Sequence, residues 1–215
     1  MSGDKDVDRV DEILRIRRSN SLSPVIAFHG CKKSVAETLL KVGAWNPDKD
    51  WWKPSTKSYD WLGSGMYFWI DSPQRAYEWS KISQARAKTS SAAPGLVGAL
   101  INPGLCLNLM DVGVIDELHQ AFSYLKVIRK AAGMPLPENG LNDPQGMALL
   151  RKLDCEVIQT VHQIRADKGE QPYDSVMGFF EEGAMAFEGS SIRAHTHVQI
   201  AVRNPEAIVG FFRVI

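Results

Sequence analysis

The sequence predicts an α+β fold, in which mainly antiparallel strands form a sheet and a helical segment is inserted between them. Short apolar stretches that end at Gly, Pro, Asn or Asp recur along the chain, which is typical of strands joined by tight turns. From Asp111 to Lys168 the apolar residues recur at helical spacing instead, in two stripes separated by a loop at residues 133–144, and the second stripe starts at Leu149. A chain of 215 residues with 44% apolar content can bury a full core. We therefore expect one domain over residues 1–215, with a helical insertion at residues 111–168 inside it.

The expected elements can be placed in chain order. An N-terminal helix is predicted over residues 7–18, where apolar residues recur at roughly helical spacing. The segment Ser34–Glu37 matches a capping box that opens a second helix, and Gly43 can end that helix. Asp71 and the Ser-Pro pair after it supply an N-cap and a first-turn proline for a third helix, which runs to about Lys88. Strands are predicted at residues 25–29, 65–69, 96–101, 105–110, 175–180, 198–202 and 207–214.

Charge and cysteine content exclude several classes of protein. Lys plus Arg and Asp plus Glu number 25 each, so no global field draws the chain to nucleic acid or to an anionic membrane. The three cysteines, Cys31, Cys106 and Cys155, lie far apart, which argues against a disulfide scaffold or a zinc site and fits a reducing cytosol. His195 and His197 lack a third ligand at suitable spacing, so we expect no metal. Because there is no signal-peptide core and no apolar run of roughly 20 residues, we expect a cytoplasmic protein without a membrane partner.

All six tryptophans lie between Trp45 and Trp79. This concentration indicates either an aromatic-lined cleft or a loop held down by large rings, and the sequence leaves both interpretations open. Nearby, His29 and Gly30 end an apolar stretch, and Tyr67 follows a glycine-led turn. An imidazole beside a glycine lets a ring nitrogen and the backbone both reach a ligand, while an aromatic ring can stack on it. The pairing of these residues suggests a nucleotide pocket.

The order of these motifs points to a family. His29-Gly30, then Gly63-Ser-Gly-Met-Tyr67-Phe-Trp, then Ala76-Tyr77 and the late strand Gln199-Ile-Ala-Val together resemble the ADP-ribosyltransferase superfamily. The closer likeness is to its diphtheria-toxin and poly(ADP-ribose) polymerase branch, whose three catalytic strands carry His, Tyr and usually Glu. The likeness covers residues 25–80 and 175–214, whereas the helical insertion has no counterpart. It implies a split, mainly antiparallel sheet that holds NAD as co-substrate, and the chain shows no G-x-G-x-x-G after a predicted strand.

The resemblance also assigns roles to individual residues. His29 would hydrogen-bond the adenine-side ribose, and the main chain of Gly30 would bind the nicotinamide carboxamide. Tyr67 would lie against the nicotinamide ring, and Tyr77 or Trp79 would close the opposite face. The expected NAD-binding residues are therefore His29, Gly30, Ser64, Gly65, Tyr67, Tyr77 and Trp79.

The third strand departs from the family pattern, because Gln199 stands where a catalytic carboxylate is usual. Breaking the nicotinamide–ribose bond creates positive charge on the sugar, which a carboxylate on the ribose hydroxyl would stabilise best. Gln199 can hydrogen-bond that hydroxyl without a full charge, which favours single ADP-ribose transfer over chain elongation. Alternatively, Glu181, Glu182 or Glu188 supplies the carboxylate. The expected catalytic residues are His29, Tyr67, Gln199 and Glu182.

On this basis we expect a mono-ADP-ribosyltransferase that cleaves NAD and modifies a macromolecule, in the style of bacterial toxins or phage-conflict enzymes. Protein is favoured over nucleic acid as the acceptor, although a basic groove near Lys126, Arg129 and Lys130 would guide RNA or DNA. A toxic activity would call for an inhibitor or antitoxin protein. Two alternatives stay open: an NAD glycohydrolase with water as acceptor, and a module that binds NAD or ADP-ribose without catalysis.

Overall fold

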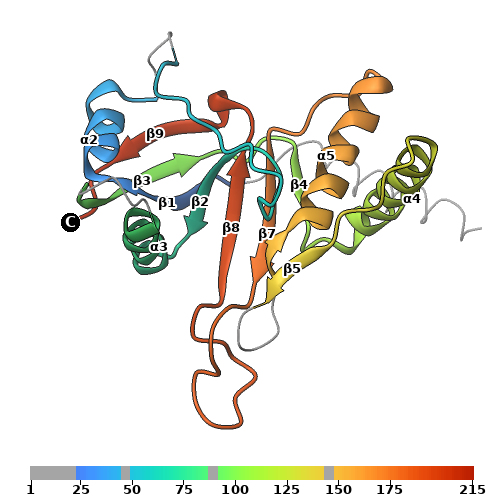
Figure 1. Cartoon of the computed structure of the whole chain (residues 1–215). Coiled ribbons are helices and arrows are strands. Elements are labelled where there is room, and N and C mark those ends of the chain that lie inside the picture. The colour runs from blue at the N-terminus through green and yellow to red at the C-terminus, as the bar shows by residue number, and fades with distance from the viewer. Residues whose placement is uncertain (1–22, 45–48, 87–91, 143–147) are drawn as a thin grey trace, which may run out of the picture.

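The main element of the fold is a seven-stranded sheet (Figure 1). The computed structural model describes residues 23–44, 49–86, 92–142 and 148–215, so the helix expected at residues 7–18 lies outside the described residues. Every neighbouring pair in the sheet is antiparallel except the parallel pair β4–β7, which confirms the prediction of an α+β fold with mainly antiparallel strands. In sheet order the strands are β4 (Cys106–Asn108), β7 (Ser175–Phe180), β8 (His197–Val202), β2 (Met66–Ile70), β1 (Val25–Lys32), β3 (Pro94–Ile101) and β9 (Ile208–Phe212).

Two neighbouring strands near the middle of the sheet, β1 and β2, are joined over only a short distance. β1 pairs with β3 over eight residue pairs, and β2 pairs with β8 over five. The ladder between β1 and β2 contains two pairs, Ala27–Ile70 and Phe28–Trp69. Beyond Phe28 these two strands have no further ladder pair, so the sheet opens there into a β1-β3-β9 part and a β2-β8-β7-β4 part.

Helices α2 and α3 cover opposite faces of the sheet (Figure 1). Ala27 lies in the core cluster that also contains Leu39 of α2, whereas its neighbour Phe28 lies in the cluster that contains Ala76 of α3. Neighbouring residues of a strand point to opposite faces, so the two clusters lie on opposite sides of β1. None of the described helices is long and apolar enough to cross a membrane. The helices are α2 (Lys33–Val42), α3 (Pro73–Arg86), α4 (Ile115–Ala131) and α5 (Lys152–Asp167), with short 3-10 helices at Val112–Val114 and Pro205–Ala207.

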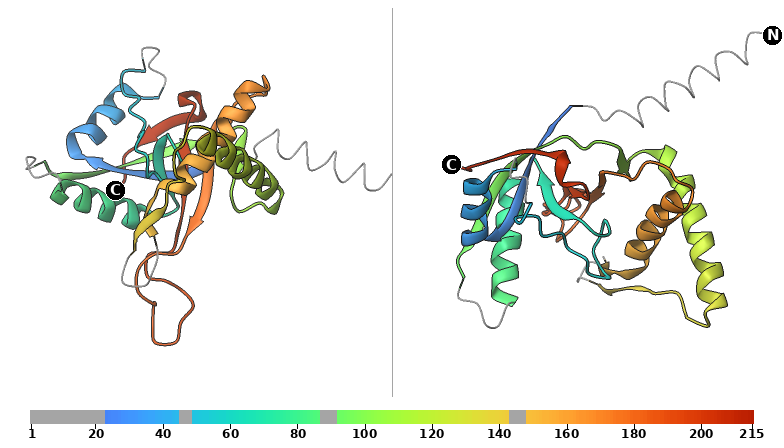
Figure 2. Two further views of the ribbon diagram at one scale, coloured as in Figure 1. Left: turned by 45° about the vertical axis from the view of Figure 1, so that its right-hand side comes forward. Right: turned by 90° about the horizontal axis from the view of Figure 1, so that it is seen from above.

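Helices α4 and α5 of the expected insertion lie together at the end of the molecule away from α2 and α3 (Figure 2). A third core cluster joins them to the sheet, because it contains Ala121 of α4, Ile158 of α5, Leu107 of β4 and Val176 of β7. The insertion therefore shares a core with the β4–β7–β8 part of the sheet.

The loop that the sequence predicts at residues 133–144 is confirmed for residues 133–138, whereas residues 139–142 form a strand of a β-hairpin. Strands β5 (Asn139–Asn142) and β6 (Ala148–Arg151) pair antiparallel, and β6 contains Leu149, which the helical stripe had placed in a helix. The Asn139 side chain explains where α5 starts, because its Oδ1 accepts the main-chain N–H of Leu153 at 2.9 Å and that of Asp154 at 3.3 Å. Two of the N-terminal N–H groups of the helix are thus satisfied from the other strand of the hairpin.

The capping box predicted at Ser34–Glu37 does not open α2. The helix begins at Lys33, and its N-cap residue, Lys32, makes no side-chain hydrogen bond. Ser34 already lies inside the helix, where its carbonyl oxygen accepts the hydroxyl of Thr38 at 2.9 Å. The predicted end of the helix is confirmed, since Gly43 has φ 73° and donates its N–H to the Leu39 carbonyl.

Candidate functional site

A cavity of about 700 Å³ lies where the sheet opens between β1 and β2. We call it the cleft. Its volume is in the range of pockets that bind small organic ligands. Residues of β1, β2, β8, α3, the loop before β2, the β5–β6 hairpin and the segment after β7 line it. Six of the residues expected from the sequence are among them: His29, Gly65, Tyr67, Trp79, Glu182 and Gln199.

His29 of β1 has a defined orientation in the cleft. Its Nδ1 lies 2.8 Å from the carbonyl oxygen of Tyr67. A carbonyl can only accept, so Nδ1 carries the proton and donates it. Burial of the ring lowers the pKa of His29, and the hydrogen bond to Tyr67 raises it by less. The imidazole is therefore neutral at pH 7, and Nε2 is left as a hydrogen-bond acceptor.

Gly30, expected from the sequence to bind NAD, is not among the residues that line the cleft, but its main chain faces the opening between the strands. The carbonyl of Ile26 accepts the N–H of Asp71 at the end of β2, so Ile26 directs its polar groups toward β2. Along an antiparallel strand, the N–H and C=O groups of successive residues point alternately to the two neighbouring strands. Gly30 lies four residues after Ile26, so its N–H and C=O also point toward β2. The last β1–β2 pair is Phe28–Trp69, so no ladder partner faces Gly30 there. A Cβ at Gly30 would collide with the Ala76 carbonyl of α3, which explains why glycine stands at this position.

Tyr67 of β2 offers its ring, because its hydroxyl is already occupied. The hydroxyl accepts the N–H of Leu62 at 2.8 Å and donates to the carbonyl of Gly63 at 2.7 Å. Burial is the main reason why the pKa of Tyr67 is raised well above its ordinary value, so the phenol stays protonated. The two hydrogen bonds fix the loop before β2 against the strand and hold the ring in one position.

Gln199 lies on β8, directly opposite Trp69 on β2 and Gly178 on β7. Its side chain is 7% exposed and lines the cleft. Within the part of the chain that the structure describes, its amide group has no hydrogen-bond partner. The amide is therefore free to bind a ligand in the cleft.

Glu182 lines the cleft as one member of an ionic cluster. Its Oε2 lies 2.6 Å from Nη2 of Arg75 on α3, and both side chains are 13% exposed. The same oxygen is 3.7 Å from Nδ1 of His197, which is 2.6 Å from the carbonyl of His195. Burial is the first cause of a lowered pKa at His197. Arg75 thus compensates the charge of Glu182, a contact that nothing in the local sequence around either residue indicates.

Two of the expected NAD-binding side chains lie outside the cleft lining. Tyr77 is 36% exposed, and the Lys81 ammonium group lies 5.3 Å from its ring centre. The hydroxyl of Ser64 accepts a hydrogen bond from the Gln159 amide of α5. Of the two aromatic residues considered for the face opposite Tyr67, Trp79 is the one that reaches the cleft.

The tryptophans and the expected basic groove lie only partly where the sequence indicated. Among the tryptophans, Trp61, Trp69 and Trp79 line the cleft, whereas Trp51 is buried in the core cluster of α2. The interpretation as an aromatic-lined cleft therefore fits Trp61, Trp69 and Trp79, and the interpretation as large rings that hold a loop in place fits Trp51. In the expected basic groove, Arg129 is held by Glu156, with Nη2 2.5 Å from Oε1, which leaves less positive charge there than the sequence indicated.

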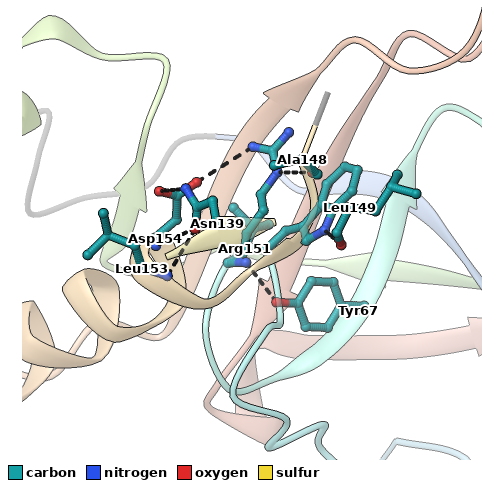
Figure 3. Close-up of polar contacts among 9 residues, drawn as sticks. Tyr67, Asn139, Ala148, Leu149, Arg151, Leu153 and Asp154 are labelled. Carbon is teal, nitrogen blue, oxygen red and sulfur yellow. Dashed lines mark hydrogen bonds and ion pairs between the residues drawn. The ribbon is translucent and has the colours of Figure 1, made fainter. Parts of the chain in front are cut away.

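Trp61 joins the β5–β6 hairpin to the cleft, which the sequence did not indicate. Its Nε1 donates to the carbonyl of Leu149 at 2.9 Å. The guanidinium carbon of Arg151 lies 4.2 Å from the Trp61 ring centre and 4.9 Å from that of Phe180. Figure 3 draws the hairpin residues together with Tyr67, which lines the same cleft, and marks the hydrogen bond to Leu149. The hairpin is therefore a wall of the cleft.

Buried histidines are expected to make stability depend on pH. Burial, helped by the charges of Arg203 and Arg165, lowers the pKa of His162 from 6.5 to about 3. As pH falls below 6.5, His162 is protonated in the unfolded chain but stays neutral in the folded chain. Protonation therefore favours the unfolded state, and the free energy of unfolding decreases on acidification. The lowered pKa values of His29 and His197 act in the same direction.

We therefore expect urea denaturation to give a lower free energy of unfolding at about pH 5 than at about pH 7.5. The variant His162→Gln should show a shallower pH dependence than the unmodified chain. His119→Gln, on the exposed face of α4, is the control for loss of a histidine. An equally steep pH dependence in His162→Gln would contradict the prediction.

Comparisons with family models, with curated proteins and with solved structures found no match for this chain.

Proposed function

We propose that the protein is a mono-ADP-ribosyltransferase that binds NAD in the cleft and transfers ADP-ribose to a macromolecule. The observation that carries the proposal is the opening between β1 and β2. There, His29 and Tyr67 both line the cleft, and Gly30, the residue after His29, has no ladder partner on β2. The strands that carry His29, Tyr67 and Gln199 are neighbours in the sheet, which supports the resemblance to ADP-ribosyltransferases.

The cleft offers a complementary group for each part of NAD. Nε2 of His29 would accept a hydrogen bond from a ribose hydroxyl. The carboxamide both donates and accepts, which matches the N–H and C=O of Gly30. The rings of Tyr67 and Trp79 would enclose the nicotinamide. Lysines and an arginine on the cleft wall suit the diphosphate: Lys53, Lys57 and Arg86.

The proposed reaction breaks the bond between ribose C1 and the nicotinamide nitrogen. Its electron pair goes to the pyridinium ring, which leaves as neutral nicotinamide, and positive charge develops on the ribose. The amide oxygen of Gln199 would accept a hydrogen bond from the ribose hydroxyl, and its partial negative charge would help to stabilise the positive charge on the ribose. The acceptor nucleophile then forms a bond to C1 and loses a proton. Since Arg75 binds Oε2 of Glu182, Oε1 is the oxygen that would take this proton.

Two observations favour a second candidate, a module that binds NAD or ADP-ribose without cleaving it. Gln199 carries no charge, and the charge of Glu182 is compensated by Arg75. NAD glycohydrolysis is the intermediate case, in which water replaces the acceptor. For the transferase, we further propose a cytoplasmic location, where NAD is supplied. A toxic transferase would also call for an inhibitor protein.

The test is incubation of the purified protein with NAD labelled in the adenine moiety, with and without cell lysate. Nicotinamide release with label on lysate macromolecules would support the transferase. Nicotinamide release with all the label in free ADP-ribose would support the glycohydrolase. If NAD stays intact in every sample but binds in calorimetry, the binding module is correct, and if NAD does not bind at all, the proposal fails.

A further inference from the structure

One wall of the cleft is apolar and is not needed for the NAD contacts proposed above. It consists of two aromatic residues from the loop before β2 and three leucines from the β5–β6 hairpin. We call it the apolar shelf: Tyr59, Trp61, Leu141, Leu149 and Leu150. Leu141 is 67% exposed, although most leucines of a folded protein are largely buried.

The shelf is held in place by specific contacts. The pairs Gly140–Leu150 and Asn142–Ala148 place Leu141 opposite Leu149 in the hairpin. The indole of Trp61 donates to the carbonyl of Leu149, and Asn139 ties the base of the hairpin to α5 (Figure 3).

The backbone of Leu141 is also strained. Its φ is 50°, in the left-handed region that residues with a Cβ rarely adopt. Such strain costs free energy and is found preferentially at functional sites. Here it holds a leucine side chain at the cleft, exposed to solvent.

The shelf is joined to the proposed NAD site through adjacent residues. Trp61 contacts the hairpin, and the next residue, Leu62, donates its N–H to the hydroxyl of Tyr67 at 2.8 Å. A group bound on the shelf would therefore lie at the hairpin side of Tyr67, next to the nicotinamide that this residue is proposed to hold. An acceptor must reach the same part of the cleft to attack the ribose.

Charge decides which kind of acceptor fits the shelf. The described hairpin residues before Arg151 are Asn, Gly, Leu and Ala, without any charged side chain. Arg151 itself packs against the rings of Trp61 and Phe180. A nucleic acid would need cations along its phosphates and hydrogen-bonding groups at its base edges, and the three leucines supply neither. The cations elsewhere on the cleft wall, including Lys57 beside Tyr59, are assigned above to the diphosphate of NAD. An apolar side chain of a protein is the complementary group.

We infer that the apolar shelf is the acceptor subsite, and that the acceptor is a protein with an apolar side chain beside the residue that is modified. This inference rests on the proposed function, because it names the substrate class of the same cleft.

The test compares the unmodified chain with the double variant Leu141→Ser, Leu149→Ser. With labelled NAD and lysate, we expect the variant to transfer at least about tenfold less label to protein, since two apolar contacts are lost. Without lysate, its rate of nicotinamide release should remain within about twofold of the unmodified chain, because neither residue is among the groups proposed to bind NAD. Phe187→Ser is the matched control, since Phe187 is 65% exposed in the segment between β7 and β8 and does not line the cleft.

Five results would overturn the inference. Label that is removed by nuclease and not by protease would identify a nucleic-acid acceptor. A parallel loss of transfer and of nicotinamide release would place the shelf in the NAD site. Unchanged transfer in the double variant, or an equal loss in Phe187→Ser, would show that the shelf does not select the acceptor. If the unmodified chain releases no nicotinamide at all, the proposed function has failed, and this inference fails with it.

Discussion

Replacing His29 with alanine is expected to reduce nicotinamide release from NAD at least about 100-fold, the scale found when one preorganised polar group is removed from an active site. The side chain has two tasks in the cleft. Its Nε2 is the acceptor for a ribose hydroxyl, and its Nδ1–H binds the Tyr67 carbonyl where the β1–β2 ladder has ended. Alanine removes both, so the ribose loses its anchor and the Tyr67 carbonyl loses its partner. The measurement is kcat/KM for nicotinamide release, which includes the loss of NAD binding.

Tyr77→Phe is the control for this experiment, because Tyr77 was expected at the NAD site from the sequence but lies outside the cleft lining. Its rate should stay within about twofold of the unmodified chain. Circular dichroism of both variants separates loss of activity from loss of fold. A folded His29→Ala variant that keeps the full rate would show that NAD does not bind in the opening between β1 and β2.

The strands that carry the site were predictable because their signals are local. Val25–His29 and Val198–Val202 are apolar stretches of strand length, and the structure places strands over both, with β1 continuing to Lys32. The same holds for the glycine at the end of α2, whose φ of 73° only a glycine adopts readily. For these elements the intrinsic preference of the sequence and the final fold agree.

The β5–β6 hairpin was missed because its stability comes from distant residues. Gly140 and the asparagines beside it have low strand propensity. Leu149 and Leu150 continue the apolar spacing of α5, so a helix was the natural prediction for them. The contacts that favour the hairpin join Leu149 to Trp61, 88 residues earlier, and Arg151 to the same ring. No local pattern encodes contacts at that separation.

The candidate site shows the same division. The residue types at His29, Tyr67 and Gln199 could be singled out from the sequence, and the structure brings all three to one cleft. The ion pair between Arg75 and Glu182 could not be predicted, because the two residues are 107 positions apart in the sequence. The sequence also could not show whether Tyr77 or Trp79 faces the cleft, because this depends on how α3 is rotated against the sheet.

The variant Gln199→Glu is expected to release nicotinamide about tenfold faster than the unmodified chain at neutral to alkaline pH, because a charge-assisted hydrogen bond is roughly twice as strong as a neutral one. Glutamate has nearly the same shape as glutamine, so it fits a position that is 7% exposed. Its carboxylate would face the positive charge that develops on the ribose. The measurement is the rate of nicotinamide release across a pH series. Gln199→Leu is the control, because leucine keeps the approximate size of the side chain and removes its hydrogen bond. This control variant should be slower than the unmodified chain.

The pH dependence of this gain separates a charge effect from a change in packing. Burial beside Trp69 disfavours an ionised carboxyl and raises its pKa above that of an exposed glutamate. The variant should therefore lose its advantage as pH falls and the carboxyl takes up a proton, whereas a packing effect would persist at every pH. If the folded variant binds NAD as the unmodified chain does and is no faster at any pH, residue 199 does not face the ribose hydroxyl. The catalytic carboxylate would then have to be Glu182, and Glu182→Gln, which keeps a hydrogen-bond acceptor for Arg75, would have to abolish the reaction.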